Sequence, residues 1–467
     1  MADGHHSGGD MPHLQRNIGL IGATALVVGG VIGSAIFALV REMTMNAGHA
    51  LWLAFLLAMA VSVVGVIPLI QLAVVFPRAG AGYLFASRLI SPAVGAVTSC
   101  CVILGGACST IVVTLTLANY FIGFFALAWP PTVVGLVILG VFYAIYWGGV
   151  RLAMGLQVLM AIQFLIALGI YAIAGVRHVD LQIALVSPKG GGGMFLAFLL
   201  CYLTCLGFQV VAEMGEEITH PRRNIPLALA IGGVIVTIIY IIVGTVFASA
   251  VPYEDLAALS APLADSAQAF LPPWAIQFLF LGALTAGLTS LNAAAIALPR
   301  EMYAQARDGI APRVFAEVDR RTHAPMHAVS AYFAVVVLLL VLGLEMDYYG
   351  YMAAVGIQAM SGIICIAALR LPARFPDRHA HAYFRVPRWL LWSCTVITIV
   401  VAVGSSLLLS FERPSIPLTY AATIGLVVIY YRLRIPRLRR SGFPFDHHVR
   451  LIPGEEEAHL AVQGESS

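Results

Sequence analysis

The stretch Gly29-Gly30-Val31-Ile32-Gly33-Ser34-Ala35-Ile36-Phe37 lies in the middle of the first long apolar run of the chain. Each glycine inside a helix costs about 1 kcal/mol relative to alanine. In lipid, an unwound turn also leaves backbone N–H and C=O groups without partners, so a break persists where these groups face a ligand or a wet cavity. The stretch therefore predicts a broken membrane helix at the centre of a binding site. The alternative is that its glycines allow neighbouring helices to pack closely.

The composition indicates a polytopic membrane protein. Of the 467 residues, 60% are hydrophobic and 10% are charged, and the mean hydropathy is +0.91. The net charge of +3, without a basic patch, indicates no nucleic-acid partner. The seven cysteines lie in apolar segments and show neither a disulfide framework nor zinc spacing, so we expect no metal site. No nucleophile–base pair or pair of acids suggests an enzyme, and no cofactor is expected.

The chain contains twelve apolar runs long enough to cross a bilayer, at about twenty residues per helix. They lie near residues 18–40, 50–76, 92–125, 131–148, 152–175, 194–214, 226–250, 274–303, 328–345, 348–369, 389–410 and 416–432. We therefore predict a tail at 1–16, a core at 17–371, two further helices at 372–432 and a second tail at 433–467.

Basic residues predict the orientation of these helices. If the N-terminus is cytoplasmic, only Arg41, Arg177, Lys189 and Arg413 of the 26 lysines and arginines lie in outward loops. The excess of positive charge on the inner side predicts a multi-pass protein with both termini in the cytoplasm.

The sixth run contains a second weak point, Tyr202-Leu203-Thr204-Cys205-Leu206-Gly207-Phe208. The first run opens one block of five helices, about 18–176, and the sixth opens another, about 190–371. Interrupted segments at matching places in two halves indicate an inverted-repeat transporter with its substrate site at the midplane of the membrane.

Four patches resemble the amino acid–polyamine–organocation (APC) transporters. Gly29–Phe37 resembles the family's first-helix signature G-x-I-G-S-G-I-F, and Phe76-Pro77-Arg78-Ala79-Gly80-Ala81-Gly82-Tyr83 resembles its P-x-x-G-G-x-Y loop. The segment from Gly207-Phe208 to Glu216-Glu217-Ile218-Thr219-His220-Pro221-Arg222-Arg223-Asn224-Ile225-Pro226 and the end of helix eight, Asn292 to Arg307-Asp308-Gly309, resemble two further signatures. The resemblance implies a LeuT-like 5+5 inverted repeat with broken helices 1 and 6, followed by two C-terminal helices. Ala35 and Leu203 depart from the pattern, in place of a glycine and of a common aromatic gate.

The resemblance implies an amino acid substrate, whose two charges suit two broken helices. Amides near Ile32, Gly33, Ser34 and Ala35 lie at the positive end of a half-helix and are expected to bind the α-carboxylate. Carbonyls around Leu203, Thr204 and Leu206, beside Gly207, are expected to accept from the α-ammonium. Phe208 and Asn292 are candidates for the side-chain pocket, although ordinary packing is an alternative for each. Helices one, three and ten, and helix eight before Glu301, carry no acid, which favours small or apolar neutral substrates.

Two ions are candidates for coupling. A sodium site could use the carbonyls of Gly29 and Ile32 with hydroxyls from Thr285, Thr289 or Ser290, although such hydroxyls commonly bond their own helix. Glu213 is the deepest carboxyl group of helix six and is a candidate proton relay. Its alternative role is a salt bridge near the cytoplasmic end.

Charged residues crowd the predicted cytoplasmic face and predict a gate of ion pairs: Glu216, Glu217, Arg222, Arg223, Arg300, Arg307 and Asp308. A static charge belt at the level of the headgroups is the alternative. We thus expect ion-coupled (proton or sodium) secondary active transport of amino acids across the plasma membrane by alternating access. An amino acid/polyamine exchanger, a channel and a sensor are the alternatives. The bilayer and the amino acid are the expected partners, and the sequence indicates no oligomeric state.

Overall fold

A computed structural model describes residues 16–33, 35–125, 127–147, 150–179, 187–205, 207–259, 262–440 and 445. Over these residues the secondary structure is helical, which confirms the expected all-α class. The helices that build the bundle are α1 (Leu20–Ile32), α2 (Ala35–Ala47), α3 (Leu51–Val75), α4 (Ala81–Leu89), α5 (Pro92–Phe125), α6 (Pro131–Tyr146), α7 (Val150–Gly175), α8 (Gly190–Thr204), α9 (Gln209–Glu213), α10 (Pro221–Ala250), α11 (Pro262–Ala267), α12 (Pro273–Ala297), α13 (Pro299–Arg307), α14 (Met326–Val341), α15 (Met346–Arg374), α16 (Pro376–Ala380), α17 (Arg388–Glu412) and α18 (Ser415–Arg440). Short 3₁₀ turns are η1 (Gly48–Ala50), η2 (Val176–His178), η4 (Tyr253–Ala258) and η5 (Arg313–Ala316).

Eight helical stretches in the described part of the chain are long and apolar enough to cross a membrane. They coincide with eight of the twelve predicted runs. The other four runs contain shorter apolar helices, which are Leu20–Ile32, Pro131–Tyr146, Gly190–Tyr202 and Met326–Val341. Two of these four stop at an interruption in the helix, and the count of twelve spans stays a prediction.

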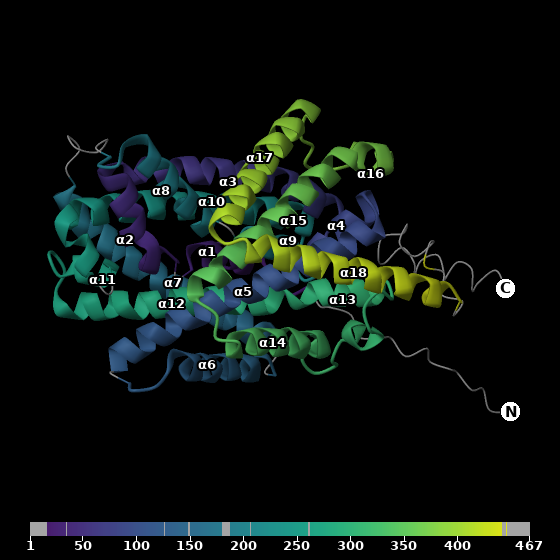
Figure 1. Cartoon of the computed structure of the whole chain (residues 1–467), viewed down its shortest axis with the longest axis horizontal. Helices are drawn as coiled ribbons and strands as arrows, with labels where there is room; N and C mark the ends of the chain where they lie inside the picture. The colour runs from purple at the N-terminus through teal and green to yellow at the C-terminus, as the bar shows by residue number, and fades with distance from the viewer. Residues whose placement is uncertain are drawn as a thin grey trace.

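The packing of the helices follows a repeated pattern. Helix α1 packs on α10, and α8 packs on α3. Helix α7 packs on α12, and α5 packs on α15. Helices α17 and α18 lie at the edge of the bundle, with α17 against α15 and α18 against α5 (Figure 1).

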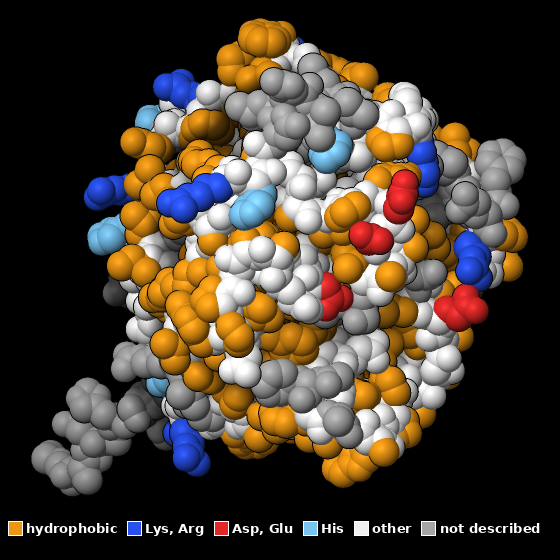
Figure 2. Space-filling model, turned by 90° about the vertical axis from the view of Figure 1, so that its left-hand side faces the viewer, with side chains coloured by type: hydrophobic (Ala, Val, Ile, Leu, Met, Phe, Trp, Pro, Cys, Tyr) orange, Lys and Arg blue, Asp and Glu red, His pale blue; other side chains and the backbone are white. Residues whose placement is uncertain are grey.

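The first described residues, near Ile18, and the last turn of α18 lie at the same end of the bundle, beside the segment that contains Glu217 and beside α4 and α13 (Figure 1). We call this end of the bundle the ion-pair end, for three ion pairs described below. There the strand-like residue Ile18 donates its N–H to the carbonyl of Glu217 at 3.0 Å, and Thr219 donates back to the carbonyl of Ile18 at 2.9 Å. These bonds fasten the start of α1 to the segment that follows α9. The opposite end presents mostly apolar side chains with scattered charges (Figure 2).

Candidate functional site

The first helix is interrupted at Gly33. Helix α1 ends at Ile32, Gly33 has a φ of +39°, and α2 begins at Ala35. A left-handed φ is costly for residues with a Cβ, and glycine adopts it without that cost. Ser34 lies outside the described residues, as does the side chain of Ala35. Gly33, one of the residues of the predicted carboxylate site, therefore lies at the break in the first helix.

The other two glycines of this stretch differ in their surroundings. A Cβ on Gly29 would lie 2.4 Å from Nε2 of Gln157 and 2.8 Å from Cβ of Thr289. A Cβ on Gly30 would lie 3.4 Å from the carbonyl oxygen of Gly207, which is an ordinary contact distance. The packing interpretation thus describes Gly29, whereas the break belongs to Gly33.

The second interruption separates α8, which ends at Thr204, from α9, which begins at Gln209. Gly207 has a φ of +142°, and a Cβ there would lie 2.5 Å from the carbonyl oxygen of Gly30. The two interrupted helices therefore touch through glycine backbone. Leu206 and the side chain of Leu203 lie outside the described residues.

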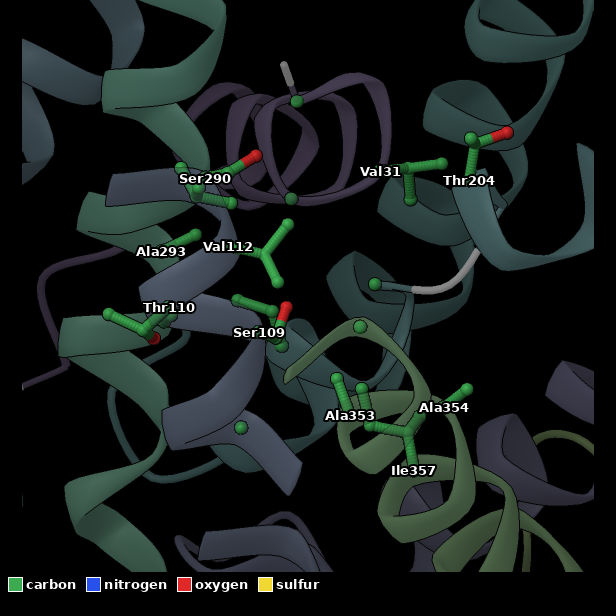
Figure 3. Close-up of a pocket in the computed structure, with 18 of the residues that line it drawn as sticks. Val31, Ser109, Thr110, Val112, Thr204, Ser290, Ala293, Ala353, Ala354 and Ile357 are labelled. Carbon is green, nitrogen blue, oxygen red and sulfur yellow. The ribbon is translucent and has the colours of Figure 1, made fainter. Parts of the chain in front are cut away.

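A cavity of about 360 Å³ lies beside both breaks. Gly33 and Val31 line it from the first break, and Thr204 and Gly207 line it from the second. Figure 3 shows the remaining walls, with Ser109, Thr110 and Val112 from α5, Ser290 and Ala293 from α12, and Ala353, Ala354 and Ile357 from α15. The lining is mainly small and apolar, so the cavity suits a small molecule with an apolar part.

Two predicted pocket residues point elsewhere in this conformation. Asn292 donates from Nδ2 to Oε1 of Gln157 at 2.9 Å, and Gln157 donates from Nε2 to the carbonyl of Ala25 at 3.2 Å. This buried chain connects α12, α7 and α1. Phe208 lines a second, much smaller cavity together with Tyr202 and Cys205. Their roles in binding a substrate stay predictions.

Two of the hydroxyls predicted for the sodium site lie at the carbonyl of Gly29, whereas the hydroxyl of Thr285 bonds Oε1 of Gln163 and a carbonyl of its own helix. Ser290 donates from its hydroxyl to the carbonyl of Gly29 at 2.7 Å, and the hydroxyl of Thr289 reaches the same oxygen at 3.4 Å. Thr289 also bonds the carbonyl of Ala286 in its own helix at 2.8 Å. Carbonyl and hydroxyl oxygens are the hard ligands that such a cation prefers.

Glu213 shares a helix N-terminus with a second buried carboxyl group, that of Glu301. Oε2 of Glu213 accepts from the N–H of Ala81 at 2.8 Å, and Oε1 of Glu301 accepts from the N–H of Gly82 at 2.8 Å. Oε1 of Glu213 also accepts from Gly82, at 3.3 Å. Both acids therefore cap α4, and they join it to α9 and α13. Glu213 also lines the large cavity.

Three buried or half-buried ion pairs connect the helices at the ion-pair end. Arg300 pairs with Glu217 at 2.7 Å and Arg307 pairs with Glu216 at 2.7 Å. Asp308 accepts from Nη2 of Arg88 at 2.9 Å, and the hydroxyl of Tyr83 also bonds it.

Arg222 and Arg223 differ from the other gate candidates, because their side chains are exposed at the start of α10. Arg88, Glu301, Gln157 and Tyr240 were not among the predicted site residues. Glu301 belongs to the quoted helix-eight motif, and Arg88 lies shortly after the quoted loop motif. These two motifs were the signal in the sequence that could have identified both residues. Gln157 stands in a helix without a motif. Tyr240 lies in α10, far beyond the motif residues at the start of that helix, and its hydroxyl lies 2.8 Å from the carbonyl oxygen of Val31 and 3.2 Å from that of Thr204.

Comparison with known proteins agrees with this geometry. The family model described as amino acid permease matches residues 18–429. The branched-chain amino acid permease BcaP of Bacillus subtilis is 22% identical over 384 residues, covering 78% of this chain and 82% of its own.

Two cationic amino acid transporters are also similar. The vacuolar cationic amino acid transporter 4 of Arabidopsis thaliana is 27% identical, over 77% of this chain and 64% of its own length. The mouse cationic amino acid transporter 4 is 29% identical, over 72% of this chain and 56% of its own length. The chain thus spans less than two thirds of these two relatives. The family match extends over both breaks, the cavity and the ion-pair end, and this chain belongs to the amino acid permease family of the APC superfamily.

Proposed function

We propose that this transporter is a secondary active permease that takes up small or apolar neutral amino acids across the plasma membrane by alternating access. The observation that carries the proposal is the meeting of two interrupted helices, through Gly30 and Gly207, beside a mainly apolar cavity. Backbone groups freed by such breaks recognise the charged ends of a zwitterion. The apolar walls would then receive its side chain.

The inverted repeat of two five-helix blocks is part of this proposal. If α1 corresponds to α8 and α3 to α10, then the packing of α1 on α10 is the counterpart of the packing of α8 on α3. The packing of α7 on α12 and of α15 on α5 forms a second such pair. Both pairs are what two blocks related by a two-fold axis require.

The substrate is proposed to lie between the two breaks. The amides of Gly33, at the break, and of Ala35, at the start of α2, would hold the α-carboxylate. The carbonyls at the end of α8 would accept from the α-ammonium. The name of BcaP, a branched-chain amino acid permease, agrees with an apolar side chain.

A cationic substrate, an amino acid or an amine, is the second candidate. Glu213 places a carboxyl group at the wall of the cavity, where it could attract a positive side chain. The names of two relatives also specify cationic amino acids. The hydrogen bonds from Ala81 and Gly82 already occupy this carboxyl group, which favours the neutral substrate.

Coupling is proposed to use sodium at Gly29, Thr289 and Ser290, or a proton at Glu213. The candidate sodium site brings the carbonyl of Gly29 on α1 together with two hydroxyls on α12. The carboxyl group of Glu213 lies between the cavity and the amides of α4, so a change in its charge would alter the attachment of α9 to α4. The imposed gradient that drives uptake distinguishes the two.

The ion-pair end is proposed to be the cytoplasmic gate. Its orientation follows from the excess of basic residues on this side. Arg300 and Glu217 are almost inaccessible, so separating them without new partners would be costly, and opening must hydrate or re-pair both. Glu213, Glu216 and Glu217 follow one break, whereas Arg300, Arg307 and Asp308 follow α12, so opening would separate these two segments.

The test is uptake by proteoliposomes that contain the purified protein. Labelled leucine, alanine, lysine and putrescine are offered separately, with a sodium gradient or a pH gradient imposed in turn. We expect concentrative uptake of leucine or alanine under one gradient. Uptake of lysine or putrescine alone would favour the cationic alternative, and passive flux without accumulation would indicate a channel. Uptake of none of the four would contradict amino acid transport of this class.

A further inference from the structure

Helix α18 is longer than a membrane span and ends in a cluster of arginines at the ion-pair end (Figure 1). Its 26 residues rise about 39 Å at 1.5 Å per residue, whereas the hydrocarbon core of a bilayer is about 30 Å thick. The last nine residues of the helix contain five arginines, which are Arg432, Arg434, Arg437, Arg439 and Arg440. These arginines therefore reach the level of the lipid headgroups when the helix spans the membrane.

One face of α18 changes from apolar to basic along the helix. Leu426, Ile429 and Leu433 are 68%, 57% and 58% exposed. Arg437 and Arg440 follow at the same spacing of three or four residues, so they continue this stripe, and both are exposed. Lipid tails would cover the apolar part of the stripe. The change from leucine to arginine then marks the boundary between the tails and the headgroups.

The described part of the chain does not neutralise the charge of this stripe. Among the described residues, Arg437 and Arg440 have no ionic partner, and neither has the exposed Arg432. A cluster of basic residues directly inside a membrane helix attracts anionic lipids. Guanidinium groups also bind phosphate oxygens with two parallel hydrogen bonds. An anionic membrane surface is therefore the partner that complements this end of α18.

The opposite face of the same turns is bonded to the ion-pair end. Nε of Arg434 donates to the carbonyl of Gly309 at 3.2 Å, and the hydroxyl of Tyr430 donates to the carbonyl of Ile310 at 2.7 Å. Both carbonyls belong to the loop that directly follows Asp308. The end of α18 thus holds the loop that begins at an acid of the proposed gate.

An apolar cluster joins these turns of α18 to α4. Ile435 and Leu438 are buried in one cluster with Ile310 and with Tyr83 of α4. The hydroxyl of Tyr83 bonds Asp308, which belongs to one ion pair of the proposed gate. A movement of the end of α18 would therefore disturb the contacts around this ion pair from two sides.

We propose that the last turns of α18 bind the anionic headgroups of the cytoplasmic membrane surface, and that this contact stabilises the closed gate. The inference rests on one part of the proposed function, namely that the ion-pair end is the cytoplasmic gate. Lipid phosphates hold the exposed face of α18, and the opposite face holds Tyr83 and the loop after Asp308 in their closed positions. Opening must loosen these contacts or draw the arginines away from the headgroups, so anionic lipid slows it.

The first measurement identifies the lipids that stay bound to the protein. Native mass spectrometry is applied to protein released from nanodiscs of equal parts of phosphatidylcholine and phosphatidylglycerol. The α18 variant carries Arg437→Gln and Arg440→Gln, and the matched control carries Arg320→Gln and Arg321→Gln, which remove the same charge from an exposed loop. The preference for retained phosphatidylglycerol should fall about threefold in the α18 variant, because two charges near the surface are lost. It should stay unchanged in the control.

The second measurement is the initial rate of leucine uptake in two kinds of vesicle. One contains phosphatidylcholine alone, and the other contains equal parts of phosphatidylcholine and phosphatidylglycerol. We expect the unchanged protein and the control to transport about threefold more slowly with phosphatidylglycerol, and the α18 variant to transport equally in both. High choline chloride should remove the difference, because salt screens exposed charges.

Tyr430→Phe examines the connection between the lipid and the gate without a change of charge. The variant removes the bond to Ile310 and keeps the ring. It should retain phosphatidylglycerol normally, while the slowing by this lipid should shrink to about half, since one hydrogen bond between α18 and the loop is lost. Tyr348→Phe is the matched control, because Tyr348 bonds Thr419 near the opposite end of α18 at 3.3 Å. It should leave the slowing unchanged.

Three results would overturn the inference. Equal retention of phosphatidylglycerol by the α18 variant and the unchanged protein would remove the lipid site, and equal uptake rates of the unchanged protein in both vesicles would remove its connection to the gate. Slowing of uptake by inorganic phosphate in phosphatidylcholine vesicles would show that a free anion is the ligand. If the α18 variant does not fold, Tyr430→Phe decides, through loss or persistence of the slowing. Absence of any amino acid uptake would instead overturn the proposed function, whereas the retained lipids would still decide whether α18 binds headgroups.

Discussion

The two interrupted helices differ in what they present at the break. The first has thirteen residues on either side, in α1 and α2. The second has fifteen residues before it, in α8, and only five after it, in α9. A helix of five residues sums few peptide dipoles, so its N-terminus attracts an anion weakly compared with that of α2. The two breaks are therefore complementary. Both present backbone carbonyl groups at the end of a long helix, but only the first also presents amide groups at the start of a long helix.

The glycines of the two breaks also differ in their task. Gly33 supplies a left-handed residue at the end of a helix, and Gly207 supplies a positive φ together with the absence of a Cβ. Gly207 is pressed against Gly30, whereas Gly33 lines the cavity. Substitution at Gly33 should therefore affect the ligand first, and substitution at Gly207 should affect the contact between the helices first.

The largest expected effect is that of Gly33→Leu. A residue with a side chain at a left-handed φ is strained by about 1–2 kcal/mol, and the leucine would also occupy the cavity. We expect loss of detectable leucine binding, measured by scintillation proximity on purified protein, with membrane insertion retained. Gly140→Leu is the control, because nothing lies within 4 Å of a Cβ at Gly140. Normal uptake by Gly33→Leu would contradict the assignment of the first break as the binding site of the substrate's α-carboxylate.

Gly207→Ala should have the next largest effect. Its Cβ would lie 2.5 Å from the carbonyl oxygen of Gly30, and this backbone atom moves only with α1. Strain of about 1–3 kcal/mol corresponds to a loss of kcat/KM for uptake of about fivefold to 150-fold. Gly233→Ala is the matched control, since its Cβ would meet Phe208 at an ordinary 3.7 Å. Equal uptake by both variants would show that the breaks do not need to touch.

Glu217→Gln examines the segment that follows the second break. The change leaves Arg300 buried without its counter-charge, which costs about 3–5 kcal/mol when both partners are buried. We expect the transport rate to change at least tenfold while the affinity for leucine changes less than threefold, measured by uptake and by binding. Glu42→Gln is the control, because its pair with Arg41 is about one third exposed. An unchanged rate would favour the static charge belt.

A comparison of Gly29→Ala with Gly30→Ala sharpens the division of tasks within the first helix. Alanine at residue 29 would lie 2.8 Å from Cβ of Thr289 and would displace Gln157 from its position. Such overpacking costs about 1–3 kcal/mol. Alanine at residue 30 meets its neighbour at 3.4 Å and should be nearly neutral. The melting temperature in detergent should thus be lower for Gly29→Ala than for Gly30→Ala. The opposite order would contradict the packing interpretation.

The smallest expected effect is that of Ser290→Ala. The variant removes the hydroxyl that bonds the carbonyl of Gly29 at 2.7 Å, a contribution of about 1 kcal/mol. If sodium drives uptake, the sodium concentration for half-maximal uptake should rise about fivefold. Ser393→Ala is the control, since Ser393 donates to the carbonyl of Trp389 in its own helix. Uptake that is independent of sodium in both the variant and the unchanged protein would favour a proton at Glu213 as the coupling ion.

Part of the site could be predicted from the sequence because its signals are local. Glycines where a membrane helix should be continuous indicate a break, and Gly33 and Gly207 lie at the two interruptions. Opposite charges near one helix end indicate ion pairs, and Glu216 and Glu217 do pair with arginines. Which arginine pairs with which acid could not be predicted, because the pairing depends on how three separate helices approach one another. Arg222 and Arg223, next to the same acids in sequence, remain exposed.

The class of protein, the location of the breaks and the family could be inferred without coordinates, because composition, glycine positions and motifs are properties of short segments. Contacts between helices required the folded structure: Gly30 faces Gly207, Gln157 accepts a hydrogen bond from Asn292, and the hydroxyl of Tyr240 reaches both helix ends. The physical reason is that these helices are apolar on all sides. A helix without a polar face gives no periodic signal of its rotation, so the direction in which each side chain points is set by packing alone.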